Sequence, residues 1–108
     1  MTVEPQFDEV IHAPQRIKVC ALLSSVDTLE FGVIRDHLGV ADSVASKHLK
    51  VLTDAGYVQL TKPLGQQGRA KTWVRMTAAG RHAFQGHLAA LHQMVEQASG
   101  ALALDRQD

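Results

Sequence analysis

The sequence predicts a mainly α-helical domain with one small β-hairpin. Apolar residues recur at spacings of three and four in three segments, and a fourth, at residues 14–25, is apolar nearly all round. Between two of these segments the apolar residues alternate, on either side of a stretch punctuated by Gly and Pro, as in two strands joined by a turn. The 108 residues, 45% of them hydrophobic, suffice for one domain with its own core and leave no room for a second.

The first two helices are short. One is predicted over residues 14–25 with Pro14 in its first turn, and its all-round apolar surface indicates burial on more than one side, within the domain or against a partner chain. The other is predicted over residues 28–38 and ends at Gly39, a favourable C-cap residue. Its apolar positions are Phe31, Ile34 and Leu38.

A third helix is predicted from Asp42 to Ala55, with Gly56 after it. Its core positions are Ala45, Leu49 and Leu52. The opposite face then carries two serines and two lysines at the spacings of one helix face, namely Ser43, Ser46, Lys47 and Lys50. Small hydroxyls and long cations in this arrangement suit a helix that lies in the DNA major groove.

The hairpin is predicted from strands at residues 57–62 and 71–76, paired antiparallel across a loop at residues 63–70. Trp73 falls in the middle of the second strand, where an aromatic residue is usually part of the core. Three cations stand at or beside the loop, namely Lys62, Arg69 and Lys71. There they would contact the DNA backbone or the neighbouring minor groove.

The last helix is predicted to be capped by Thr77 and to run from Ala78 to about Leu102, so that residues 10–77 form the core of the domain and residues 78–102 a dimerisation helix. Its apolar seam follows a heptad-like spacing through Phe84, Leu88, Leu91, Val95 and Ala98. At roughly 35 Å this helix is longer than so small a domain can cover. The sequence therefore predicts a homodimer through this helix, assisted by the first.

The charge distribution supports a nucleic-acid partner although the net charge is zero. Residues 1–42 have a net charge of −4, and residues 82–108 have a net charge of −2. Residues 43–81 hold seven Lys and Arg against the single acid Asp54, a balance of +6. One basic block between two acidic ones is a candidate phosphate-binding surface, because neutralised phosphates release counterions and supply non-specific affinity.

The order of these elements is that of a winged helix-turn-helix, and three motifs resemble the MarR/ArsR-type winged-helix transcriptional regulators. Residues 38–58 are similar to the recognition-helix signature of that family, and Met76-Thr-Ala-Ala-Gly-Arg81 to the opening of its last helix. His12-Ala-Pro-Gln-Arg16 is similar to the first helix of a short subgroup. The resemblance, over about residues 10–91, implies a homodimer that binds a pseudo-palindromic operator in double-stranded DNA, most often as a repressor.

The predicted DNA contacts combine the third helix and the hairpin, and they comprise Ser43, Val44, Ser46, Lys47, Lys50, Lys62, Arg69 and Lys71. In a dimer, the two recognition helices would lie one DNA turn apart, at about 34–36 Å. His48 flanks this surface, where a histidine packed beneath the helix is favoured over a DNA contact.

Metal and cofactor binding are not predicted. His82, His87 and His92 are five residues apart and fan around the last helix, while His92 and Glu96 supply only two ligands where structural zinc takes four. A regulator that responds to a metal ion, or to pH through histidines near the dimer seam, stays an alternative. A small-molecule effector would have to use a crevice between the dimer helices and the DNA-binding part, and no residue set marks one.

Other classes of protein fit less well. Ser46 and His48 point to different faces of a helix and cannot act as nucleophile and base, so an enzyme is not expected. A winged helix that binds only protein stays the main rival, although it has no need of cations on two separate elements. The acidic N-terminus, the lone Cys20 and the lack of an apolar run of spanning length predict a soluble cytoplasmic protein without a membrane association.

Overall fold

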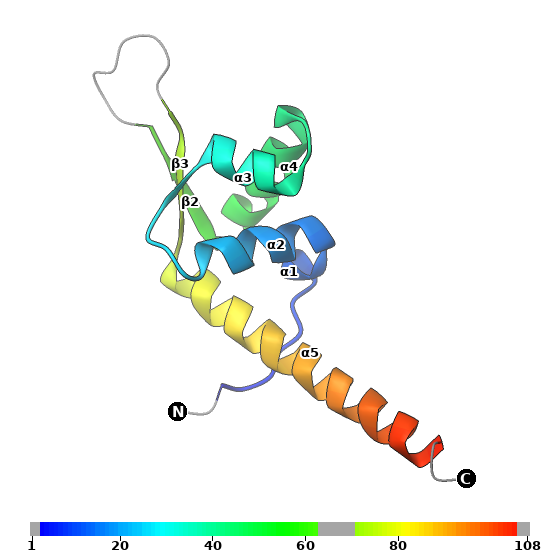
Figure 1. Ribbon diagram of the computed structural model, residues 1–108. Helices are drawn as coiled ribbons and strands as arrows, with labels where there is room; N and C mark the ends of the chain where they lie inside the picture. Colours follow the sequence, from blue (N-terminus) through cyan, green and yellow to red (C-terminus); the bar gives the residue numbers. More distant parts are fainter. Residues whose placement is uncertain (1–2, 63–70, 106–108) are drawn as a thin grey trace.

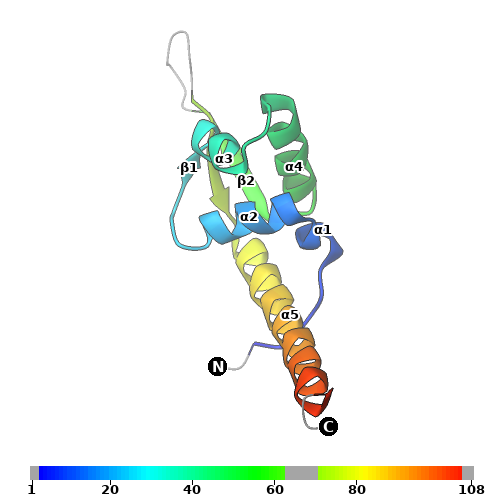
Figure 2. The ribbon, with the colours of Figure 1, turned by 45° about the vertical axis from the view of Figure 1, so that its right-hand side comes forward.

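The computed structural model describes residues 3–62 and 71–105 and shows a small helical domain with one long helix that extends away from it (Figure 1). The elements are α1 Glu9–His12, α2 Pro14–Leu23, β1 Leu29–Glu30, α3 Phe31–Leu38, α4 Asp42–Asp54, β2 Val58–Thr61, β3 Trp73–Met76 and α5 Ala78–Asp105. Turning the view shows α2, α3 and α4 grouped at one end of α5, whose later turns project beyond them (Figure 2). The predicted mainly α architecture with a small antiparallel sheet is confirmed.

The sheet has three strands rather than the two of a simple hairpin, in the order β1-β3-β2 with antiparallel pairing throughout. The prediction of a helix from residue 28 was wrong by three residues, because Leu29 and Glu30 are extended and pair with Val74 and Trp73. Helix α3 begins at Phe31, whose N–H still donates to Thr72 O at 2.8 Å. The loop-side end of the hairpin is therefore tied to the start of α3.

The core lies between the sheet and the inner faces of the helices. It includes Ile11, Val19, Leu23, Ile34, Leu38, Leu49, Leu52, Val58, Val74, Met76 and Phe84. In β3 the burial alternates, since Val74 and Met76 are buried while Trp73 and Arg75 are exposed. The expectation that Trp73 belongs to the core was wrong: its side chain is 36% exposed, because the strand turns Val74 and Met76 inward.

Thr77 caps α5, as predicted, and it also joins this helix to the residues just before β2. The Thr77 hydroxyl accepts a hydrogen bond from Gly80 N at 3.0 Å and donates one to Gly56 O at 2.6 Å, while Thr77 N donates to Tyr57 O at 3.0 Å. An N-cap of this kind is typically worth about 1 kcal/mol. These bonds fix the direction in which α5 leaves the domain.

In the same first turn of α5, Arg81 joins this helix to the segment that follows α2: its guanidinium donates to Ser24 O at 2.9 Å and to Val26 O at 3.2 Å. Within the described ranges, no helix combines the length and the apolar character needed to cross a membrane.

Candidate nucleic-acid interface

Helix α4 has one buried face and one exposed face. Ala45 and Leu52 are fully buried and Leu49 is 1% exposed. The polar set that the sequence places opposite them is exposed, together with Val44 at 41%; the set is Ser43, Ser46, Lys47 and Lys50. The structure thus presents all five α4 residues of the predicted DNA contact on the solvent side of one helix.

The turn that sets α4 against α3 depends on Gly39 and Arg35. Gly39 takes a left-handed conformation with φ 67° and donates to Arg35 O at 3.0 Å, which closes α3 as a C-cap. The Arg35 guanidinium bonds Asp42 at 2.8 Å and Asp36 at 3.0 Å, and these carboxylates raise the pKa of Arg35. Sequence spacing did not reveal that Arg35 links the end of α3 to the first turn of α4.

His48 is half-buried beneath α4 rather than on its exposed face. Its Nδ1 lies 3.3 Å from an Arg16 guanidinium nitrogen, and Arg16 also donates to Val10 O. Because a guanidinium only donates, His48 Nδ1 must accept. Burial, followed by the charges of Arg16 and Lys47, lowers the pKa of His48, so the neutral ring supports α4 from below. This agrees with the preference for a structural histidine at this position.

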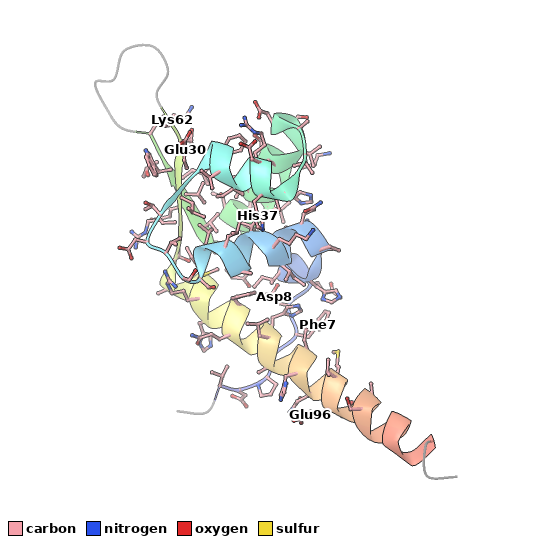
Figure 3. All side chains as sticks on the ribbon, viewed as in Figure 1. Phe7, Asp8, Glu30, His37, Lys62 and Glu96 are labelled. Atoms are coloured by element: carbon pink, nitrogen blue, oxygen red, sulfur yellow. The ribbon has the colours of Figure 1, made fainter. Side chains whose placement is uncertain are left out.

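A groove separates α4 from the loop-side end of the hairpin and has a volume of about 550 Å³. Its lining includes three hydroxyls, two lysines, one carboxylate and two large apolar side chains, namely Ser46, Thr53, Thr72, Lys50, Lys62, Asp54, Leu60 and Phe31. Figure 3 shows Lys62 at the end of β2, on the hairpin side of this groove. The two basic elements predicted to meet on one duplex therefore border a common groove.

Two of the predicted contact lysines are paired with carboxylates. Lys50 Nζ lies 3.2 Å from Asp54, one turn further along α4, and Lys71 Nζ lies 3.7 Å from Glu30. Both lysines are largely exposed, so each pair is weak in water. A phosphate that bound either lysine would replace its carboxylate. Arg69, in the loop at residues 63–70, lies outside the described residues.

Replacing Asp54 with Asn is expected to raise DNA affinity by up to about fivefold. In this variant Lys50 can bind a phosphate without first giving up its ion pair with Asp54. The plot of log affinity against log salt should steepen by about one unit. Fluorescence anisotropy with a labelled duplex at several salt concentrations measures both. Asp27→Asn is the control, since it makes the same charge change at an exposed site between α2 and β1. Equal gains in both variants would assign the effect to net charge alone.

The predicted dimer seam on α5 divides into two parts. Phe84 was assigned to the interface, and this is wrong: the residue is 6% exposed and packs in the chain's own core, because the first turns of α5 lie against the domain. Further along, Leu91 is half-buried and the other seam positions are exposed, with Leu88 at 43% and Val95 at 60%. Ala98 is also exposed, as is Met94, which the sequence interpretation left out.

Metal ligands do not gather in the part of the chain that the structure describes, where no three His, Cys, Asp or Glu side chains are placed to share an ion. The His92 and Glu96 pair stands at 3.1 Å on exposed helix surface.

Comparisons with known proteins agree with this geometry. A family model described as a winged helix DNA-binding domain matches residues 15–95. An uncharacterised protein of Methanocaldococcus jannaschii is 31% identical over 86 residues, which cover 80% of this chain and 92% of that protein.

Two solved structures share the fold. A transcriptional regulator homologue from Pyrococcus horikoshii OT3 superposes with a TM-score of 0.77 at 21% identity, over 83% of this chain and 88% of the other. The PcaV transcriptional regulator from Streptomyces coelicolor, solved with its natural ligand, gives a TM-score of 0.70 at 21% identity, over 94% and 70%.

Proposed function

The chain belongs to the winged helix DNA-binding domain family, and we propose that this DNA-binding transcription regulator binds a pseudo-palindromic operator as a homodimer and represses transcription. The observation that carries the proposal is the exposed face of α4, where Ser46, Lys47 and Lys50 stand opposite a buried apolar face. A helix of this kind inserts into the major groove, while the hairpin cations reach the flanking backbone.

Dimer formation is supported by the part of α5 that begins at Leu88. Exposed Leu88, Met94 and Val95 lie on a helix that runs beyond the domain, where a monomer offers no surface to cover them (Figure 2). Two such helices related by a two-fold axis would bury these side chains against each other. The same axis would place two α4 helices on successive major grooves, about 34–36 Å apart.

We also propose that the protein acts in the cytoplasm, and that it acts by binding DNA rather than by catalysis. We add a small-molecule effector as a partner, supported by the ligand of PcaV. A space for it would be the crevice between α5 and the winged-helix core. The described part of that crevice is a cavity of about 250 Å³ between the N-terminal segment, Tyr57 and the first turns of α5.

The decisive test is selection of bound duplexes from a random DNA pool by the wild type and by Lys47→Ala/Lys50→Ala. We expect the wild type to enrich a motif with two-fold symmetry and the variant to enrich none, because removing two cations at α4 lowers affinity by at least tenfold. Lys18→Ala is the matched control, since Lys18 is an exposed lysine on α2, outside the basic block. Enrichment of the same motif by the double variant would overturn the assignment of α4 to the groove.

Salt dependence separates the regulator from a protein-binding adaptor. Affinity of the wild type for its selected duplex should fall linearly with log salt, and Lys47→Ala should flatten the slope by about one unit. Absence of DNA affinity at low salt, in a protein that is folded and dimeric, would favour the adaptor.

A further inference from the structure

The N-terminal strap, residues 3–8, crosses α5 and is tied to it. Gln6 N donates to Gly86 O at 2.9 Å, at a point where a Cβ on Gly86 would lie 3.3 Å from Glu4 O. Phe7 and Asp8 lie between α1 and α5, in the angle between the domain and the long helix (Figure 3). The strap thus connects the start of the chain to the helix that carries the exposed apolar stripe.

The strap ends on a buried histidine of α5. His87 is 0% exposed, and both of its ring nitrogens have partners. Asp8 N donates to His87 Nδ1 at 2.9 Å, and His87 Nε2 lies 3.2 Å from Nδ1 of His12, on α1. Because Nδ1 of His87 accepts, the neutral ring carries its proton on Nε2 and donates it to His12 Nδ1.

Phe7 covers this histidine pair. Its ring centroid lies 4.7 Å from that of His12 and 4.8 Å from that of His87, and the Phe7–His87 contact has edge-to-face geometry. An apolar ring packed against the buried His87 imidazole lowers the local polarity and disfavours the charged form of that ring.

Neither histidine of the pair can take up an additional proton without losing a hydrogen bond. A proton on His87 Nδ1 would oppose the Asp8 N–H donor, and a proton on His12 Nδ1 would oppose the proton on His87 Nε2. If His12 instead donated to His87 Nε2, then His87 would carry its own proton on Nδ1 and again oppose Asp8 N–H. A proton on His87 Nδ1 therefore breaks the bond that holds Asp8 of the strap, and a proton on His12 Nδ1 breaks the bond between the two histidines.

The surrounding groups do not neutralise an added charge. The Asp8 carboxylate accepts hydrogen bonds from Val10 N at 2.9 Å and Ile11 N at 3.2 Å as the N-cap of α1, and from the Tyr57 hydroxyl. Its hydrogen bond with Asp8 raises the pKa of Tyr57 to about 12, and burial raises that of Cys20 to about 12, so both stay neutral. Asp8 is the one carboxylate whose charge acts on His87 among the described groups, and its oxygens are already engaged.

We propose that His87, held between Asp8 and His12, forms an acid-sensitive latch, which holds the N-terminal strap on α5 when the His87 ring is neutral and releases it when that ring is protonated. In the released state, Phe7 and the strap leave the part of α5 that immediately precedes the exposed apolar stripe at Leu88. A resulting change in DNA binding rests on the proposed function, since it would act through the dimer, whereas the latch itself is a property of the single chain.

The direction of the pH dependence follows from His87. Burial, and then the charge of His12, lower the pKa of His87 below its ordinary value, and the Asp8 carboxylate only partly opposes them. Once the strap is released and the ring is hydrated, the pKa returns to about 6.5. Docking stability is therefore fully present above about pH 6.5 and is lost as the pH falls below it, because the released state binds more protons.

The experiment measures hydrogen exchange of the Gln6 and Asp8 amides by NMR, at pH 7.5 and 5.5, corrected for intrinsic exchange and without DNA. We expect both protection factors to fall at least tenfold in the wild type at the lower pH, while the Leu49 amide of α4 stays protected. His87→Asn keeps an acceptor near the Nδ1 position without a titrating ring, and its strap should stay protected at both pH values. Unchanged wild-type protection, or an equal loss in His87→Asn, would overturn the latch.

A second pair of variants guards against a folding defect at the buried site. His12 is exposed, and His12→Asn removes one titrating ring while keeping an acceptor for His87 Nε2. Without the charge of His12, the docked pKa of His87 rises toward its released value, so the two states differ less in bound protons and strap release should move to lower pH. His92→Asn, also at an exposed position, should leave it unchanged. An unchanged midpoint in His12→Asn would overturn the pairing, and neither result depends on whether the protein binds DNA.

Discussion

Gly80→Ala is expected to destabilise the fold by about 1–3 kcal/mol, through overpacking where α5 leaves the sheet. A Cβ at this position would lie 2.1 Å from Tyr57 O and 2.9 Å from Tyr57 C. These are backbone atoms, and Tyr57 O also accepts the hydrogen bond from Thr77 N, so they cannot move without displacing α5. Urea unfolding followed by circular dichroism measures the loss, with thermal unfolding as a check.

Gly100→Ala is the matched control, because a Cβ there meets nothing within 4 Å and the position is exposed on the same helix. An alanine in an open helix position should stabilise the chain by about 0.5–1 kcal/mol. The same substitution at two positions of α5 is thus expected to have opposite signs. Equal stability of Gly80→Ala and the wild type would show that α5 is not held against Tyr57.

The exposed polar face of α4 could be predicted from sequence because it depends on one helix period. Ala45, Leu49 and Leu52 fix the inward direction of α4, and the outward positions of Lys47 and Lys50 then follow from geometry alone. The paired strands followed from alternation and from the Gly/Pro-punctuated segment between them. Strand β1 did not, since two residues give no period and its pairing with β3 is a tertiary contact.

The sequence prediction was wrong where an apolar pattern continued unchanged from a buried part of the chain into an exposed one. The apolar spacing on α5 runs without a break from Phe84 to Ala98, yet the domain covers its start and leaves the rest exposed. Trp73 was misplaced because strand alternation fixes two faces but not which of them is buried. Val74 and Met76, which share one face, settle that question in the structure.

The His12–His87 contact was beyond sequence reasoning for a different reason. His87 meets Asp8 across 79 positions and His12 across 75, so no spacing within one element relates it to them. His87 was considered with His82 and His92 as one of three residues fanned around a helix. Burial distinguishes it from them, since it is 0% exposed while the other two are exposed.

Val95→Glu is expected to abolish dimer formation and to weaken operator binding by at least about 100-fold. Val95 is 60% exposed in the single chain, so the glutamate is solvated in the monomer and leaves the fold intact. In the proposed two-fold dimer, two carboxylates would be buried close together, and each uncompensated buried charge costs several kcal/mol. Since 1.4 kcal/mol corresponds to a factor of ten, a 100-fold loss needs only about 2.8 kcal/mol.

Analytical ultracentrifugation and anisotropy with the selected duplex measure the two effects of Val95→Glu, and Gln93→Glu provides the control. Gln93 is exposed on the same helix, and at 100° per residue it lies about 160° away from Val95, on the side opposite the apolar stripe. This variant adds the same charge to the same turn, so it should dimerise and bind as the wild type does. If Val95→Glu formed dimers at the same concentrations as the wild type, the interface would have to lie elsewhere than on the apolar stripe. Equal losses of DNA affinity in both variants would indicate that the added charge repels DNA, rather than that the second subunit is lost.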